Sequence, residues 1–246
     1  VKFHYKNKLR NLFIFITIKN IMKKKIVAFD LDGTLINSAP DITHALNAVL
    51  YSNNLKMVKE ENVRNLIGNG AKALIIQSFN KQNKSISNLS KLVQDFLDEY
   101  KTCFMRKTKL YENVLDALRI LKENKIKLIL VSNKPEYYVE KLIKHFNLEL
   151  YFSSFSGGDT FNCRKPDSKH LLYSINKANI YNNYIGVFVG DSKYDLECAN
   201  NSNWPCVLYS NGYSDIDIKL LKPTKIFNNY KDLPDIINKI FSKYFL

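Results

Sequence analysis

The sequence has few of the residues that break regular structure and few of those that cross-link small folds. Only 8 Gly and 6 Pro occur in 246 residues, which excludes a collagen-like or low-complexity chain. The 4 Cys stand at positions 103, 163, 198 and 206, too far apart for a zinc knuckle or a redox motif, so we expect free thiols in a reducing cytosol. In contrast, 15 Tyr, 15 Phe and a hydrophobic content of 46% supply a core for one large domain or two modest ones.

The net charge of +14 is unevenly distributed along the chain. Residues 1–25 carry 8 cationic residues and no acid, which leaves 14 − 8 = +6 for the remaining 221 residues. Only 5 of the 37 cationic residues are Arg, the residue that phosphate-reading surfaces favour. We therefore predict no nucleic-acid partner.

Residues 1–21 precede Met22 and include an apolar run at 12–18. Seven residues cannot span a bilayer, and no small-residue cleavage site follows the run. We expect folding to begin near Met22 and residues 1–21 to be an N-terminal extension, disordered or derived from a non-native start. No membrane association is predicted, and the expected location is cytoplasmic.

Short apolar runs without alternation predict buried parallel strands, at residues 26–29, 128–131, 187–189 and 206–209. Helical patterns separate these runs, at residues 112–124, 135–146 and 167–178. Strands that alternate with helices predict an α/β protein whose parallel sheet is covered on both faces.

The pattern changes between residues 38 and 106, where strand-like runs are missing. Amphipathic helical segments follow one another there, at residues 41–51, 60–67, 70–79 and 89–104. We interpret residues 38–106 as a helical domain inserted after the first strand. The core domain would then comprise residues 22–37 and 107–246.

Polar residues stand at the ends of three of the predicted strands. Asp30, Ser132 and Asp191 stand at these positions, and the carboxyl ends of parallel strands share one edge of a sheet. Asp32 can turn back toward Asp30 because Gly33 follows it. Clustered carboxylates need a cation, and oxygen ligands suit Mg²⁺.

A phosphate group at the same edge would need donors and positive charge. Ser132 and the backbone amides near Asn133 could supply the donors, and Lys165 the charge. Within such a site an Asp can serve as a nucleophile toward phosphorus. The sequence thus predicts a magnesium-dependent site for a small phosphate ester.

Four segments in this order resemble the motifs of the haloacid dehalogenase superfamily: Asp30-Leu31-Asp32-Gly33-Thr34-Leu35, Ser132-Asn133-Lys134, Lys165-Pro166, and Gly190-Asp191-Ser192 through Asp195. The resemblance covers about residues 25–212. It implies a Rossmannoid three-layer core with a parallel sheet and a helical cap domain of the first type.

Three further segments are similar to the phosphoglycolate phosphatase family, at residues 36–42, 63–71 and 157–159. Two segments depart from that family's pattern. Asp167-Ser168 stands where a His-Pro pair is frequent, and residues 201–204 replace small residues. These departures concern the surroundings of the charged motif positions and bear on substrate fit more than on chemistry.

The resemblance implies a role for each motif residue. Asp30 would be the nucleophile and a Mg²⁺ ligand, Asp32 the acid and base as well as a ligand through its carbonyl, and Asp191 a third ligand. Asp195 would orient metal-bound waters or Lys165. The remaining candidates for phosphate or substrate binding are Ser132, Asn133, Lys165, Gly33, Thr34 and, at a turn between helices, Asn69.

Several alternatives to a phosphoglycolate phosphatase remain open. A pyrophosphatase, nucleotidase or sugar phosphatase would use the same aspartates, and so would a mutase like β-phosphoglucomutase. A dehalogenase is disfavoured because its chemistry needs neither Mg²⁺ nor Asp32. A catalytically silent binding module would tolerate Asp30→Asn without functional loss. We expect a monomer or homodimer.

Overall fold

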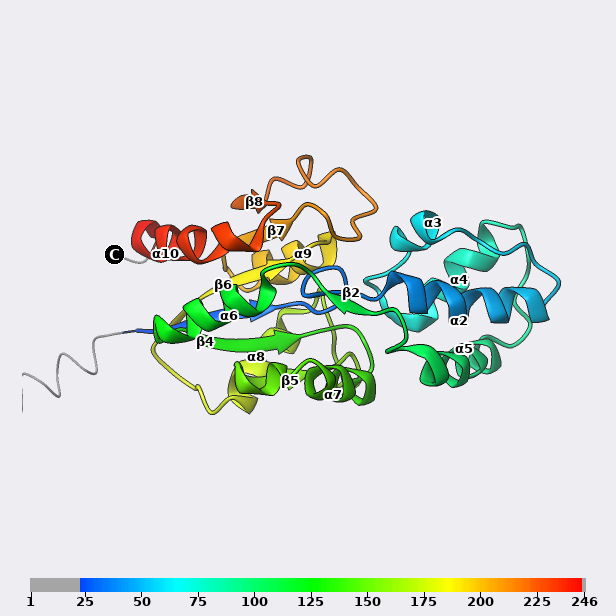
Figure 1. Ribbon diagram of the computed structural model, residues 1–246, viewed down its shortest axis with the longest axis horizontal. Helices are drawn as coiled ribbons and strands as arrows, with labels where there is room; N and C mark the ends of the chain where they lie inside the picture. Colours follow the sequence, from blue (N-terminus) through cyan, green and yellow to red (C-terminus); the bar gives the residue numbers. More distant parts are fainter. Residues whose placement is uncertain (1–22, 245–246) are drawn as a thin grey trace, which may run out of the picture.

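A computed structural model describes residues 23–244 of the chain. Its centre is a sheet of six parallel strands in the order β5-β4-β1-β6-β7-β8 (Figure 1). The strands are β1 Lys24–Phe29, β4 Lys127–Val131, β5 Phe152–Ser156, β6 Tyr184–Gly190, β7 Cys206–Tyr209 and β8 Lys225–Phe227. β1 lies between β4 and β6, where the strand order reverses, and such a position forms the ligand crevice of an open α/β sheet.

The central strand is apolar on both faces because both faces are covered. Val27 and Phe29 of β1 belong to one hydrophobic cluster, whereas Ile26 and Ala28 belong to a second cluster on the other face. All four side chains are fully buried. This two-sided burial explains why β1 reads as a continuous apolar run rather than as an alternating one.

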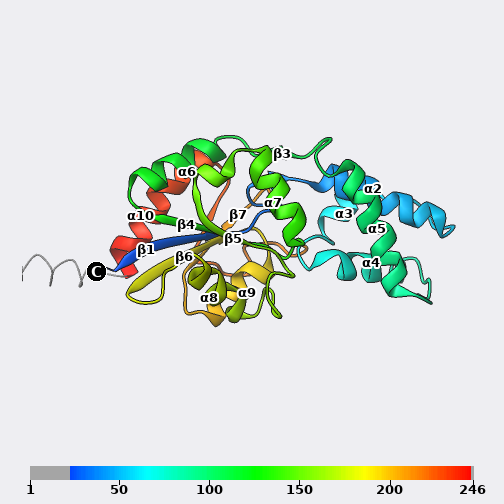
Figure 2. The same cartoon turned by 90° about the horizontal axis from the view of Figure 1, so that it is seen from below.

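Helices form the two outer layers of the core (Figure 2). One face carries α6 Val114–Glu123, α7 Glu136–His145 and α10 Leu233–Tyr244. The other face carries α8 Ser168–Lys177 and α9 Lys193–Asn201. Two short 3-10 helices, η1 Leu148–Leu150 and η2 Tyr230–Asp232, complete the core. The predicted three-layer α/β class is confirmed.

An all-helical segment extends from one end of the core (Figure 1). It contains α2 Ala39–Ser52, α3 Glu60–Arg64, α4 Gly70–Asn80 and α5 Leu89–Cys103. The chain leaves and re-enters the core through a two-stranded antiparallel ribbon of β2 Ile36–Asn37 and β3 Lys109–Leu110. Beside this ribbon, Asp41 accepts hydrogen bonds from the Lys107 and Thr108 amides and from the Thr108 hydroxyl.

The four predicted strands and the predicted helices are present, with boundaries that shift by a few residues. The sequence did not predict β5, in which three of five residues are Ser, or β8 and the ribbon strands, which are only two or three residues long. The four cysteines are free thiols, as predicted. The predicted extension of residues 1–21 lies outside the described residues.

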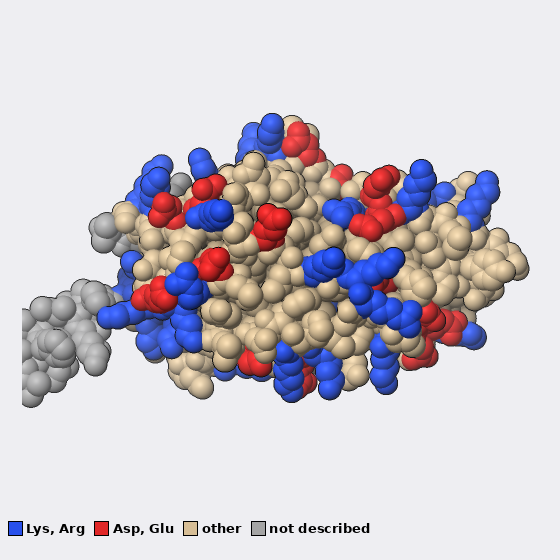
Figure 3. Space-filling model, in the orientation of Figure 1, with Lys and Arg blue, Asp and Glu red and all other residues tan. Residues whose placement is uncertain are grey.

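The described helices include none that is both long and apolar enough to cross a membrane. On the face shown in Figure 3, Lys and Arg side chains are interspersed with Asp and Glu over both the core and the helical segment.

Candidate active site

The strands bring the predicted aspartates to one edge of the sheet. Phe29 of β1 pairs with Leu130 of β4 on one side and with Val189 of β6 on the other. Asp30 therefore lies between the ends of the two neighbouring strands, from which Ser132 and Asp191 follow. All three side chains are buried, with at most 5% of each residue exposed.

Lys165 joins two of the carboxylates from the loop before α8. Its Nζ lies 2.6 Å from Asp30 Oδ1 and 2.7 Å from Asp195 Oδ1. Burial alone would lower the pKa of Lys165, but the two carboxylates outweigh it and raise the pKa above its ordinary value. Lys165 is therefore a permanent cation at this edge of the sheet.

Asp195 holds the loop that follows β6. Its Oδ2 accepts hydrogen bonds from the backbone amides of Asp191 and Ser192, at 3.2 and 3.0 Å, and from the Ser192 hydroxyl at 2.8 Å. This is a capping box at the start of α9. Because Oδ1 contacts Lys165, both oxygens of Asp195 are engaged, and the residue positions Lys165 and Asp191 together.

Asp191 is held from the opposite side by the first motif. The Thr34 hydroxyl donates to its Oδ1 at 2.7 Å, and the Tyr213 amide donates to its Oδ2 at 2.6 Å. Gly33 makes this approach possible, since a Cβ at its position would lie 2.3 Å from Asp191 Oδ2. Its φ of +82° also favours glycine. In the structure, Gly33 and Thr34 thus contact Asp191.

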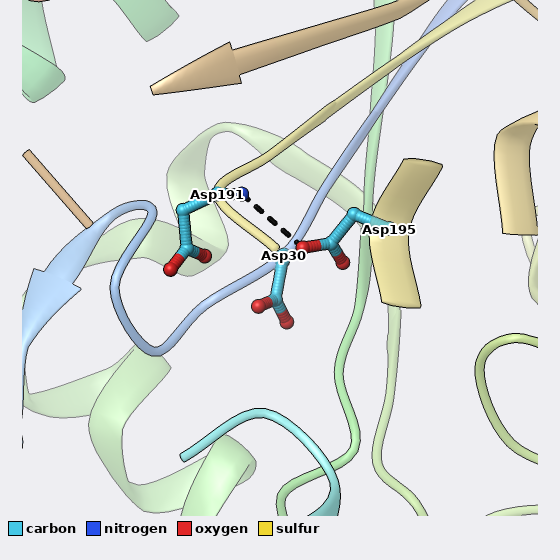
Figure 4. A group of neighbouring side chains, drawn as sticks. All are labelled: Asp30, Asp191 and Asp195. Atoms are coloured by element: carbon cyan, nitrogen blue, oxygen red, sulfur yellow. Dashed lines mark hydrogen bonds between the residues drawn. The ribbon is translucent and has the colours of Figure 1, made fainter. Parts of the chain in front are cut away.

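The electrostatics of the site favour a bound cation. Asp30, Asp191 and Asp195 each offer an oxygen within 4.8 Å of the others, and Figure 4 shows their side chains converging. Burial, reinforced by repulsion from Asp195 and Asp32, raises the pKa of Asp30 to about 7 despite Lys165. Burial, reinforced by repulsion from Asp195 and Asp30, raises the pKa of Asp191 well above its ordinary value. These oxygen donors fit a divalent cation, and the cluster could hold one.

Asp32 lies farther out and has a cation of its own. Lys134 Nζ lies 3.1 Å from its Oδ1 and 3.0 Å from its Oδ2, and the Ser38 hydroxyl donates to Oδ1 at 2.5 Å. Sequence reasoning did not assign a role to Lys134. Its position two residues after Ser132, in the same loop, could have indicated that it lies near the site.

The side chain of Asn133 connects the core to the helical segment. Its Nδ2 donates to the carbonyl oxygens of Gly68 and Lys165, at 2.9 and 3.0 Å. Within residues 23–244, its buried Oδ1 has no hydrogen-bond partner. Since both amide hydrogens are used, a phosphate would meet the backbone amide of this loop rather than the side-chain nitrogen. The phosphate-binding role of Asn133 stays a prediction.

A cavity opens between this edge of the sheet and the helical segment. The cavity has a volume of about 60 Å³, which leaves room for several waters at about 10–15 Å³ each. The core contributes polar residues to its wall, and the helical segment contributes mainly apolar ones, such as Leu74 and Phe96. Gly68 and Gly70 line the cavity, whereas the intervening Asn69 is not among the lining residues, so its substrate contact stays a prediction.

Comparison with known proteins gives a consistent picture. The model of the haloacid dehalogenase-like hydrolase family matches residues 27–209. The chain is 35% identical over 227 residues to a phosphoglycolate phosphatase of Psychrobacter arcticus, covering 89% of this chain and 98% of that protein. It is 34% identical over 220 residues to a phosphoglycolate phosphatase of Mannheimia succiniciproducens, covering 87% and 98% of the two chains.

A solved structure is similar over nearly its whole length. It is that of a predicted phosphoglycolate phosphatase from Haemophilus somnus, with a TM-score of 0.78 and 30% identity, covering 87% of this chain and 97% of the other. The chain therefore belongs to the haloacid dehalogenase-like hydrolase family, which confirms the resemblance of its four motifs. Its curated relatives place it among the phosphoric monoester hydrolases of that family.

Proposed function

We propose that the protein is a Mg²⁺-dependent phosphatase that hydrolyses 2-phosphoglycolate to glycolate and phosphate through an aspartyl-phosphate. The observation that carries this proposal is the buried contact of Lys165 with Asp30 beside Asp191, at the sheet edge where a ligand binds. The choice of 2-phosphoglycolate rests on the names of the similar proteins.

The first step is an in-line displacement at phosphorus. A carboxylate oxygen of Asp30 attacks, the bond between phosphorus and the ester oxygen breaks, and Asp32 gives its proton to the departing alkoxide. Lys165, the Ser132 hydroxyl and the backbone amides of that loop stabilise the charge on the transferring phosphoryl oxygens. Glycolate leaves with the proton of Asp32, and the phosphoryl group stays on Asp30.

The second step returns the enzyme to its starting state. Asp32, now a carboxylate, takes a proton from a water molecule, and the resulting hydroxide attacks phosphorus. The bond between phosphorus and Asp30 breaks, so inorganic phosphate leaves and Asp32 is again protonated. Asp30, Asp191 and the Asp32 carbonyl would hold Mg²⁺, which when bound offsets the charge of the carboxylates and the phosphoryl group.

The helical segment is proposed to act as a cap. Residues 38–106 would form this domain, and residues 22–37 with 107–246 the catalytic core. The hydrogen bonds from Asn133 to Gly68 and from Lys107 and Thr108 to Asp41 support a closed arrangement in which the cap excludes bulk water. A cytoplasmic location and a monomeric or homodimeric state belong to the same proposal.

The test is phosphate release from a substrate panel with and without Mg²⁺. The panel contains 2-phosphoglycolate, phosphosugars, nucleotides and pyrophosphate. We expect metal-dependent release that is greatest with 2-phosphoglycolate. Asp30→Asn should lower the rate by about 10⁴-fold or more, because it removes the nucleophile. The control is Asp116→Asn on the exposed face of α6, which should keep full activity.

Each other outcome identifies a different error. A preference for another panel member would keep the mechanism and reject the substrate. Phosphate retained on a rearranged sugar product would indicate a mutase. Absence of turnover with every compound, or full activity of Asp30→Asn, would reject the proposed mechanism.

A further inference from the structure

One cationic side chain lines the cavity beyond the phosphoryl site. Among the described residues on the cavity wall, Lys134 is the only Lys or Arg. Its side chain is 4% exposed, and a lysine is almost never buried this deeply without partners. Lys134 follows Ser132 and Asn133 in the loop after β4, so its backbone is fixed by the same strand that positions the phosphoryl site.

The partners of Lys134 come from both parts of the chain. Its Nζ contacts the Asp32 carboxylate of the core at 3.0 Å and donates to the Tyr100 hydroxyl of the helical segment at 2.7 Å. The same Nζ lies 4.6 Å from the centre of the Tyr100 ring. Lys134 therefore marks the place where the wall of the cavity changes from core to cap.

The hydroxyl of Tyr100 offers a hydrogen-bond donor beside Lys134. This hydroxyl accepts from Lys134, and among residues 23–244 its own hydrogen has no acceptor. The residue is 3% exposed and lines the cavity. Its ring packs against Phe96, Phe104 and Tyr138, at centroid distances of 5.7, 5.8 and 5.0 Å, so the hydroxyl is held in position.

An ammonium group and a phenol hydrogen that meet beside the apolar residues of the cap favour an anion. Hydrogen bonds to a charged partner gain strength where water is excluded. In the proposed reaction the one phosphoryl group of the substrate lies beside Lys165, so an anion beside Lys134 would be a carboxylate of the organic part. Lys134 contacts Asp32, the residue proposed to protonate the ester oxygen, and a carboxylate whose carbon is two bonds from that oxygen would thus lie beside Lys134.

We propose that Lys134 and Tyr100 bind the carboxylate of the leaving group and so determine the specificity of the enzyme. This inference rests on the proposed phosphatase function and extends it to the recognition of the organic part of the substrate. Lys165 and Ser132 would bind the phosphoryl group of any ester, whereas Lys134 selects esters that carry a carboxylate near the ester oxygen.

The test compares two substrates of nearly the same size. One is 2-phosphoglycolate, and the other is 2-hydroxyethyl phosphate, which has a neutral hydroxymethyl group in place of the carboxylate. Lys134→Met should lower the ratio of kcat/KM for the first substrate to kcat/KM for the second by about 10²-fold, because a charged partner is lost. Tyr100→Phe should lower this ratio by about 5-fold, because only one neutral donor is lost.

Using a ratio removes any effect on Asp32 that both substrates share. Lys134→Arg keeps the charge and should retain much of the preference for 2-phosphoglycolate. The control is Lys141→Met on the exposed face of α7, which should leave the ratio unchanged. If Lys134→Met fails to fold, Tyr100→Phe and Lys134→Arg still report on the same contact.

The outcomes separate this inference from the proposed function. If Lys134→Met lowered both values of kcat/KM by the same factor, Lys134 would only hold Asp32. The inference would then be wrong, whereas the proposed phosphatase function would be unaffected. If the unsubstituted enzyme turned over both substrates equally, carboxylate recognition would likewise be rejected. If it turned over neither, the proposed function itself would fail.

Discussion

The two ends of the cavity are built in different ways. At the proposed phosphoryl end, Asp30 lines the cavity, and behind it ion pairs and backbone hydrogen bonds join it to other core residues, namely Lys165, Asp195 and Asp191. At the leaving-group end, Lys134 and Asp32 meet Tyr100 and an apolar wall from the cap helices. The first end is a charged network on rigid strand ends, and the second is a contact between two parts of the chain.

If the proposed function holds, the two ends have separate tasks. A network that surrounds phosphorus contributes equally to every phosphate ester, because every ester presents the same group. The wall at the other end contacts only what differs between esters. Substitutions at the phosphoryl end should therefore act alike on all substrates, and substitutions at the leaving-group end should change their order.

The largest effect is expected from Lys165→Met. The change removes the cation between Asp30 and Asp195 and a charge that stabilises the phosphoryl oxygens. We expect kcat/KM to fall about 10³-fold for every substrate. The free energy of unfolding should fall by about 3–5 kcal/mol, because two buried carboxylates lose their partner.

Phosphate release and urea unfolding measure these two effects of Lys165→Met. Lys169→Met, exposed on α8, is the control. A loss confined to one substrate would contradict the assignment.

The next effect concerns Mg²⁺ and pH. The folded-state pKa of Asp30 is about 7, above the value of about 3.9 for an unfolded Asp. Between these values the folded protein binds the extra proton, so the free energy of unfolding of the metal-free protein should fall as pH rises from about 4 to about 7. Asp191 shifts in the same direction and adds to this loss.

Mg²⁺ should reverse that loss, because it needs the deprotonated carboxylates. Thermal unfolding at pH 5 and pH 8, in EDTA or in excess Mg²⁺, measures the effect. We expect the metal to raise the unfolding temperature by several degrees at pH 8 and by much less at pH 5. Asp30→Asn should flatten the pH dependence in EDTA. Equal stabilisation at both pH values would show that these carboxylates do not bind the metal.

A smaller effect is expected where the cap joins the core. Asp41→Asn replaces a buried carboxylate that accepts from the Lys107 amide, the Thr108 amide and the Thr108 hydroxyl. We expect a loss of about 1–3 kcal/mol in the free energy of unfolding, together with a rise in KM of a few-fold and little change in kcat. Asp98→Asn, exposed on α5, is the control. An unchanged KM would indicate that cap closure does not depend on this joint.

The sequence predicted the carboxylate cluster better than the contacts of Lys134, for a physical reason. Asp30 and Asp191 follow continuous apolar strands, and the shared edge of a parallel sheet brings such residues together whatever the details of packing. Tyr100 lies 34 positions from Lys134 on a helix, where its periodicity indicates only that it is buried. Which buried side chain faces the cavity depends on how the cap docks, and no local pattern encodes that contact.

The same limit applies to the residues that support the site. The backbone amide of Tyr213 holds Asp191 from a loop that carries no motif. The side-chain amide of Asn133 donates to the carbonyl oxygen of Gly68 in a turn of the cap. Strand β5 was missed because Ser153, Ser154 and Ser156 interrupt its apolar pattern. Motif spacing predicts which groups share a sheet edge, whereas the direction of each hydrogen bond follows only from the folded chain.

The smallest effect on catalysis is expected from the apolar wall. Leu74 of α4 lines the cavity, and Leu92 of α5 is buried in the same cap without reaching it. Leu→Ala at either position should cost about 2–5 kcal/mol in the free energy of unfolding, because each leaves a void. Only Leu74→Ala enlarges the leaving-group end, so only that variant should reduce the preference for 2-phosphoglycolate over phosphosugars, by about 5-fold.

The ratio of kcat/KM for 2-phosphoglycolate to kcat/KM for a phosphosugar measures this preference, at a temperature well below the unfolding temperature of each variant. A similar change in both variants would show that the preference depends on the rigidity of the cap rather than on the shape of its wall.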